Sequence, residues 1–178
     1  MSTGPIASAV AAKRCFPPVV DAHTRVLILG SLPGEVSLAH AQYYAHPQNK
    51  FWRLVGEVIG QDLVSLGYPE RLACLRAHRI GLWDVVAQAE RAGSLDSRIR
   101  HPASNDLSGL VATLPALAAI AFNGATAAKI GTRALGEAAA RLHLIALPSS
   151  SPAHASVPYA AKLLVWRELG RYAPHPRP

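Results

Sequence analysis

Five short polar segments of this sequence carry groups that could bind and act on a ligand. They are residues 30–37, 43–52, 83–86, 122–124 and 147–156. The first is a turn bracketed by Gly30 and Gly34, whose exposed backbone N–H groups could approach a phosphate, a sugar or a base. It has neither the G-x-G-x-x-G pattern nor the Gly-Lys-Ser/Thr end of a P-loop, so a plain tight turn remains the alternative.

The second segment gathers aromatic, amide and basic side chains in ten residues before a predicted helix. The carboxamide of Asn49 could hold a water molecule against a substrate, or satisfy backbone donors at the helix start. The ring of Tyr43 or of Tyr44 could stack on a base, or both could be ordinary half-buried aromatics. Lys50 leaves open a lyase that works through a Schiff base.

The other segments place polar side chains where apolar runs stop. Asp84 could recognise an amide or amine edge, act as a base, or cap the next helix. Asn123 could pair with a base edge through its donor and its acceptor, or form part of an Asn-Gly turn. Three serines between prolines could grip successive phosphates, or form a solvated loop. These serines are Ser149, Ser150 and Ser151.

Apolar strands and amphipathic helices alternate along the chain and must position these segments. Strands are predicted over residues 25–29, 80–83, 117–122 and 142–147. Helices are predicted over residues 47–59, 69–78, 106–114, 124–135 and 158–169. Four apolar strands separated by helices indicate an α/β fold, a three-layer α/β/α sandwich around a mainly parallel four-stranded sheet. Ligands of such sheets bind at the carboxyl ends of the strands, and this rule selects four segments: 30–37, 83–86, 122–126 and 147–156.

The chain has 178 residues, which suits one domain over residues 23–172 with a flexible arm over 1–22 and a tail over 173–178. The net charge of +7 favours a polyanionic partner, although an Ala- and Arg-rich composition is another possible source. Two cysteines are too few for a Cys₄ zinc site and indicate a reduced, cytoplasmic protein. We find neither a signal peptide nor a membrane-spanning run, and we expect a monomer.

Two of these segments and their order resemble the signature motifs of the uracil-DNA glycosylase superfamily. Residues 30–34 resemble the motif that follows the first strand, and residues 147–152 the motif that follows the last. Four further segments add a resemblance to the hypoxanthine-DNA glycosylase branch: 43–52, 81–85, 93–97 and 122–124. The resemblance extends from about residue 25 to residue 169.

The resemblance implies hydrolysis of the N-glycosidic bond of a deaminated base in DNA, hypoxanthine or uracil, without a metal or cofactor. Asn49 would orient the attacking water. The base pocket would be formed by Gly30, Ser31, Leu32, Tyr44, Asp84 and Asn123. The DNA backbone would be held by Ser149, Ser150, Ser151 and His154.

The chain departs from the superfamily pattern at two positions. Many members carry an Asp or Asn inside the first motif, where this chain has Ser31, Leu32 and Pro33. The second motif of uracil enzymes often opens with His, where this chain has Leu147, so we do not expect a leaving group stabilised by histidine. Two rival hypotheses stay open. One is a hydrolase of free nucleosides or nucleotides, and the other is a DNA-binding module without catalysis, with a steep salt dependence and no abasic product.

Overall fold

Four apolar strands form the parallel sheet that the sequence predicts, in a computed structural model that describes residues 10–174. The strands are β2 (Val26–Gly30), β3 (Ile80–Asp84), β6 (Ala119–Asn123) and β7 (His143–Leu147), in the order β3-β2-β6-β7. Each begins and ends within two residues of its predicted run, because a strand buried on both faces reads as a continuous apolar segment.

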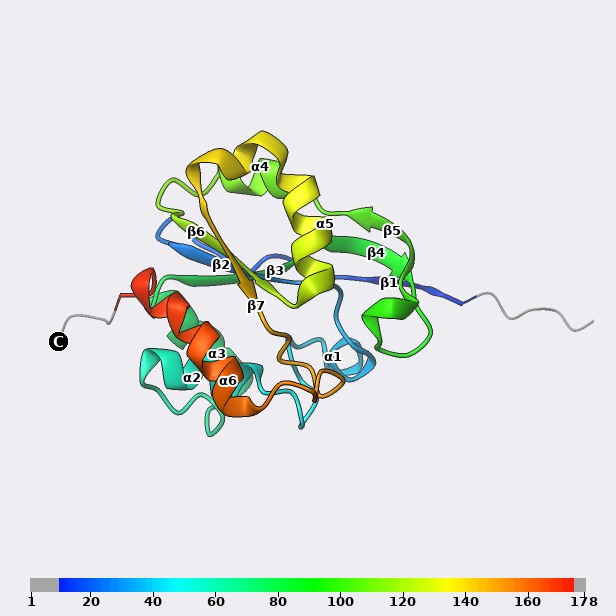
Figure 1. The fold of residues 1–178 in the computed structure, drawn as a ribbon, viewed down its shortest axis with the longest axis horizontal. Coiled ribbons are helices and arrows are strands. Elements are labelled where there is room, and N and C mark those ends of the chain that lie inside the picture. The colour runs from blue at the N-terminus through cyan, green and yellow to red at the C-terminus, as the bar shows by residue number, and fades with distance from the viewer. Residues whose placement is uncertain (1–9, 175–178) are drawn as a thin grey trace, which may run out of the picture.

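Helices cover both faces of this sheet. Val26 and Ile28 of β2 belong to one core cluster, with residues of α2 (Phe51–Ile59), α3 (Tyr68–Ala77) and α6 (Tyr159–Trp166). Leu27 and Leu29 belong to a second cluster, with residues of α4 (Leu107–Ala112) and α5 (Ala125–Leu135). This alternation follows from the two-residue period of a strand. Figure 1 shows the two helical layers on either side of the sheet, so the predicted three-layer α/β/α sandwich is confirmed.

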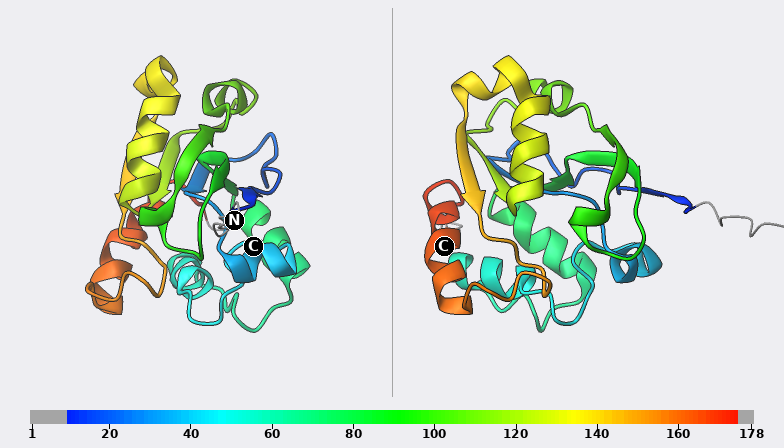
Figure 2. Two further views of the ribbon diagram at one scale, coloured as in Figure 1. Left: turned by 90° about the vertical axis from the view of Figure 1, so that its right-hand side faces the viewer. Right: turned by 45° about the vertical axis from the view of Figure 1, so that its right-hand side comes forward.

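A second, antiparallel sheet was not predicted. It consists of β1 (Ala12–Arg14), β4 (Val86–Glu90) and β5 (Arg100–Ser104), in the order β1-β4-β5, and it extends from one side of the domain (Figure 2). Val19 also bridges Leu82 of β3. The predicted arm over residues 1–22 is therefore too long, because residues 12–14 pair within the fold. Residues 1–9 of that arm and residues 175–178 of the predicted tail lie outside the described residues.

Two helices near the site differ from the sequence prediction. A six-residue helix, α1 (Glu35–His40), follows directly after Gly34 where only a turn was expected. Helix α2 begins at Phe51 and not at Pro47, because the side chain of Asn49 accepts the backbone N–H of Phe51 and closes a turn before the helix. Short 3₁₀ turns complete the fold: η1 (Asp96–Arg98), η2 (Gly136–Arg141) and η3 (Arg167–Arg171). Among residues 10–174, no helix has the length and apolar character to cross a membrane.

Candidate active site

The carboxyl ends of the four parallel strands meet at one cavity of about 710 Å³. Gly30, Asp84, Asn123 and Leu147 are the last residues of β2, β3, β6 and β7, and all four line it. A cavity of this size is typical of small-molecule and nucleotide sites. The polar segments singled out in the sequence all contribute to its wall, together with residues 94–97. The structure thus brings the separate turns together into one pocket.

Asn49 lies on the rim of this pocket, next to the serine loop (residues 148–154). The backbone N–H of Lys50 donates to the carbonyl of Ser150 at 3.0 Å, which joins the start of α2 to that loop. The Asn49 Oδ1 accepts the N–H of Phe51 at 3.0 Å, so the carboxamide is held in one orientation. A carboxamide oxygen has two lone pairs, so a water molecule can still bind there. Asn49 therefore serves as a turn residue and stays available to the cavity.

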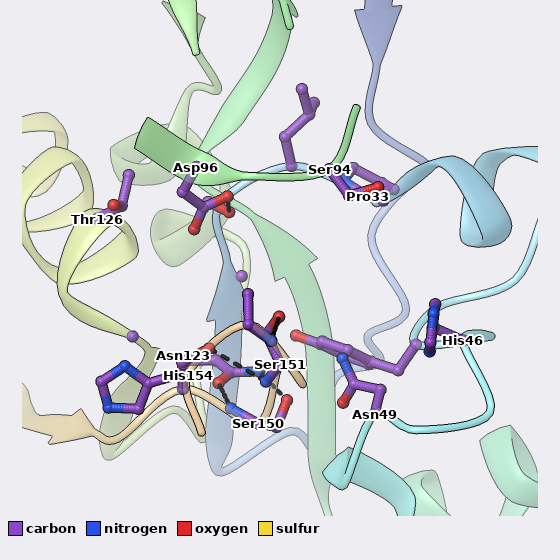
Figure 3. A pocket seen from close by; sticks show the side chains of 18 of the residues that line it. Pro33, His46, Asn49, Ser94, Asp96, Asn123, Thr126, Ser150, Ser151 and His154 are labelled. Atoms are coloured by element: carbon purple, nitrogen blue, oxygen red, sulfur yellow. Dashed lines mark hydrogen bonds between the residues drawn. The ribbon is translucent and has the colours of Figure 1, made fainter. Parts of the chain in front are cut away.

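Asn123 and Ser150 form a closed pair on the pocket wall. The Asn123 Nδ2 donates to the Ser150 Oγ at 2.9 Å, and the Ser150 N–H donates to the Asn123 Oδ1 at 2.9 Å. Figure 3 shows both bonds, with Asn49 and His154 to either side. Ser150 is only 1% exposed, so its hydroxyl orients Asn123 and is covered from a phosphate. Ser150 leaves one N–H and one lone pair of the Asn123 amide unused, and the hydroxyl of Tyr44 lies close enough to this amide for the amide to lower the Tyr44 pKa against the larger effect of burial.

The serine loop is anchored from below by a buried lysine. The Nζ of Lys162, on α6, donates to the carbonyls of Ser149 and His154, each at 2.7 Å. Within the loop, the Ser149 Oγ accepts the N–H of Ser151, and the Ser151 Oγ accepts the N–H of Ala153. These bonds leave both hydroxyl hydrogens as donors, because a hydroxyl that accepts through its oxygen can still donate. Ser149, Ser151 and His154 thus line the pocket from a rigid loop.

The serine loop contacts the end of β6 at Gly124, a position that favours glycine. Gly124 has φ +100°, a conformation that side chains rarely adopt, and a Cβ there would lie 3.2 Å from the Ser149 Cβ. Its N–H donates to the carbonyl of Leu147 at 3.0 Å, which ties the end of β6 to the end of β7. The Asn-Gly pair therefore marks a required close approach of two strand ends.

The floor of the pocket is formed by Gly30, Tyr44 and Asp84. A Cβ on Gly30 would lie 2.7 Å from the Asp84 Oδ1 and 3.0 Å from the Tyr44 hydroxyl, so only glycine leaves this space open. Tyr44 has φ 54°, which is uncommon outside glycine and is a feature of constrained sites. Its ring stacks on Phe51 with centroids 3.8 Å apart, so at most one face remains for a base.

The side chain of Asp84 is buried, and one of its two carboxyl oxygens lacks a hydrogen-bond partner within the described residues. That oxygen is Oδ2. Burial raises the pKa of this carboxyl to about 8, and the nearby Asp96 contributes to the rise, against a smaller lowering by Arg91. Asp84 therefore stays largely protonated near neutral pH.

The first motif is fixed by a buried arginine that the sequence did not reveal as a site residue. The Arg91 guanidinium donates to the carbonyls of Leu32, Pro33 and Gly93. It also lies 3.7 Å from Asp96, whose Oδ1 accepts the Ser31 hydroxyl at 2.7 Å. The hydroxyl of Ser31 is therefore used within the protein.

Backbone groups of the first motif are also partly used. The carbonyls of Gly30 and Ser31 accept the N–H groups of Val85 and Val86. A ligand would therefore meet this motif through its N–H groups and through the apolar side chain of Leu32, which lines the cavity. Ser94 and Asp96 stand on the opposite side of the pocket from Asn49 and Ser150 (Figure 3). Within residues 10–174, no three His, Cys, Asp or Glu side chains gather as a metal site would require.

Comparison with known proteins agrees with this geometry. The family model described as the uracil DNA glycosylase superfamily matches residues 17–170. The chain is 49% identical over 112 residues to a protein named hypoxanthine DNA glycosylase from Methanosarcina barkeri. It is 50% identical over 112 residues to a protein of the same name from Methanosarcina acetivorans. Each alignment covers 63% of this chain and 71% of the relative.

A solved structure is similar over nearly the whole chain. It is the solution NMR structure of a candidate uracil DNA glycosylase from Methanosarcina acetivorans, with a TM-score of 0.80 and 41% sequence identity. The similarity covers 93% of this chain and all of that one. The family match spans both signature motifs and the strands that position them. The chain therefore belongs to the uracil DNA glycosylase superfamily.

Proposed function

We propose that this protein is a monofunctional DNA glycosylase that hydrolyses the N-glycosidic bond of a deaminated base, with hypoxanthine as the first candidate and uracil as the second. One observation carries the proposal: residues from all four strand ends, from the Asn49 turn and from the serine loop line a single cavity, and Asp84, Asn123 and Asn49 bring polar side chains to it. Membership of the superfamily and two relatives named hypoxanthine DNA glycosylase support the choice of reaction and base.

The target nucleotide must leave the DNA stack to reach this cavity. Flipping costs a few kcal/mol, and the cost is least at a mismatch, which is what a deaminated base creates. Contacts with the DNA backbone must offset that cost. Ser149 and Ser151 offer hydroxyl donors from a rigid loop, His154 lies beside them, and the net charge of +7 favours the polyanion. Ser150 would act indirectly, because its buried hydroxyl orients Asn123 and does not face the DNA backbone.

Asn49 is the proposed catalytic residue. In hydrolysis the oxygen of water bonds to the sugar C1′, the bond from C1′ to the base nitrogen breaks, and its electron pair leaves with the base. The proton that water loses is finally taken up by the base. Asn49 would hold this water on the sugar side of the pocket, with its carboxamide already fixed by Phe51. Preorganised dipoles of this kind lower the barrier without moving a proton themselves.

Asn123 and the floor of the pocket would recognise the base. The N–H and lone pair of Asn123 that Ser150 does not use can meet other polar atoms of the base. Gly30 leaves room for the ring above Asp84 and Tyr44, and Leu32 would contact its face or edge. The protein would need no metal or cofactor, and we propose that it acts as a monomer in the cytoplasm, on chromosomal DNA.

The test is a glycosylase assay on duplex and single-stranded oligonucleotides that carry inosine, uracil or xanthine opposite each normal base. Alkaline cleavage after the reaction reports abasic sites. Our proposal expects strand cleavage only after alkali, with hypoxanthine released fastest. Turnover of free nucleosides with no abasic product would favour the small-molecule hydrolase, and salt-sensitive binding without any abasic product would favour a non-catalytic DNA-binding module. Cleavage without alkali would indicate a lyase and would direct attention to Lys50.

A further inference from the structure

Two buried polar atoms at the floor of the cavity have no hydrogen-bond partner within the described residues. They are the hydroxyl of Tyr44 and the Oδ2 of Asp84. Both side chains line the cavity, and both approach the position that a side chain of Gly30 would occupy. Buried polar groups are nearly always paired, and an unpaired one costs about 1–3 kcal/mol. A polar group that enters the floor of the cavity, from a ligand or from a water molecule, would satisfy these atoms.

The surroundings of Asp84 favour its neutral form. The titratable groups that face it come from several segments around it, and they are Cys15, Tyr43, Tyr44, Arg91 and Asp96. Only Arg91 among them favours the charged carboxylate, and that guanidinium is committed to three backbone carbonyls. The pKa of Asp84 is raised to about 8, chiefly by burial. At neutral pH this side chain therefore presents one O–H donor and one carbonyl acceptor.

The neutral carboxylic acid matches the edge that deamination creates. Hypoxanthine, uracil and xanthine each carry a ring N–H next to a carbonyl. A carboxylic acid meets that pair with two hydrogen bonds, because its O–H donates to the carbonyl and its own C=O accepts the ring N–H. A carboxylate offers only acceptors and would repel the carbonyl oxygen.

We propose that Asp84 works as an uncharged carboxylic acid that binds the N–H and carbonyl edge of the flipped base and stabilises the negative charge that develops on it. This rests on the proposed glycosylase function and assigns a role to one group within it. As the bond to C1′ breaks, the electron pair spreads from the ring nitrogen to the carbonyl oxygen. The Asp84 O–H then donates a stronger bond to that oxygen and keeps its proton, while water supplies hydroxyl to C1′ and a proton to the base.

The discriminating variant is Asp84→Asn, because an asparagine amide offers the same donor and acceptor and cannot ionise. We would measure the single-turnover rate constant of hypoxanthine release between pH 6 and pH 10 for both proteins. Because both proteins act on the same substrate, ionisation of the substrate affects both rate constants equally and does not change their ratio. We expect the variant to be slower by up to about tenfold at pH 7, since an amide N–H is the weaker donor. Above pH 8, the ratio of wild-type to variant rate should fall by about tenfold per pH unit.

Two further variants serve as controls for Asp84→Asn. Asp84→Ala removes both hydrogen bonds and should lose about a hundredfold or more at pH 7, where the wild type keeps its proton. Asp106→Asn makes the same chemical change at a helix cap outside the lining of the cavity, and should leave the profile of the wild type. The proposal is overturned if Asp84→Asn is as inactive as Asp84→Ala, which would require the carboxylate, or if the ratio does not change with pH.

A direct titration separates this proposal from the proposed function. The ¹³C NMR shift of the Asp84 carboxyl in the wild-type protein should titrate near pH 8 without DNA. A midpoint below pH 6 would overturn the neutral form, whatever the activity. A midpoint near 8 in a protein that releases no base from any lesion would instead refute the glycosylase assignment. The titration also needs no variant to fold.

Discussion

Asn49 has a structural and a proposed catalytic role, and a pair of variants can separate them. Asn49→Ala removes the acceptor of the Phe51 N–H at the start of α2. Loss of a side-chain acceptor at the start of a helix costs about 1 kcal/mol, which lowers the melting temperature by about 2–4 °C in a protein of this size. Loss of the water-orienting carboxamide should cost far more in rate, about a hundred- to a thousandfold.

The matched control is Asp106→Ala. The Asp106 side chain accepts the N–H of Gly109 at 2.9 Å and caps α4, away from the cavity. It should lose a similar amount of stability and keep its rate of base release. Asn49→Ser should recover part of the stability, because a serine hydroxyl can accept the same N–H, and its base release should stay slow. The assay is single-turnover base release, with melting followed by circular dichroism.

These variants can refute our reasoning. If Asn49→Ala released hypoxanthine and uracil within about threefold of the wild-type rate, the carboxamide would have only its structural role in the turn before α2. If Asp106→Ala slowed base release as strongly, the effect at position 49 would reflect general loss of stability.

Three other predictions concern the floor of the cavity, the anchor of the serine loop and the proton on Asp84. Gly30→Ala would place a Cβ 2.7 Å from the Asp84 Oδ1, so the single-turnover rate of base release should fall by about tenfold or more. The same clash should lower the free energy of unfolding by about 1–3 kcal/mol. An unchanged rate would mean that the base does not use the floor of the cavity. Lys162→Met removes the donor to two carbonyls of the serine loop, so DNA affinity measured by fluorescence anisotropy should weaken more than the rate at saturation, and the reverse pattern would contradict a backbone-holding loop. The folded state keeps the Asp84 proton up to about pH 8, whereas the unfolded chain loses it near 3.8, so this group makes the free energy of unfolding fall as pH rises between those values, by about 1.4 kcal/mol per pH unit. In urea denaturation, the free energy of unfolding of Asp84→Asn should lack this dependence on pH. An equal pH dependence in the two proteins would contradict a protonated Asp84 in the folded state.

The parallel sheet and the strand-end residues were predictable because burial on both faces leaves a plain apolar pattern. The residues that end those strands, such as Asp84 and Asn123, are polar immediately after an apolar run, so the sequence points to them. The second sheet could not be predicted in this way. Strand β5 is exposed along its length, and β1 has only three residues, so neither carries an apolar signal. Their pairing depends on contacts between distant parts of the chain.

The internal supports of the site were also invisible in the sequence. Lysine and arginine are rarely buried, so Arg91 and Lys162 would be read as surface residues. Asp96 lies in a segment, residues 93–97, that the resemblance included, but only the structure joins it to Ser31 and Arg91. Ser150 illustrates the same limit. Three consecutive serines look equivalent, and only the fold turns the middle one inward to pair with Asn123.

The central claim is that a flipped deaminated base occupies the cavity, with a water molecule held between Asn49 and the sugar. The most direct measurement is a crystal structure with duplex DNA that contains 2′-fluoro-2′-deoxyinosine, whose electron-withdrawing fluorine slows loss of the base. We predict that hypoxanthine lies above Gly30 with its N–H and carbonyl edge at Asp84, and that water bridges the Asn49 carboxamide and C1′. A base still stacked in the duplex, or a bound base with no room for water between Asn49 and C1′, would contradict the claim.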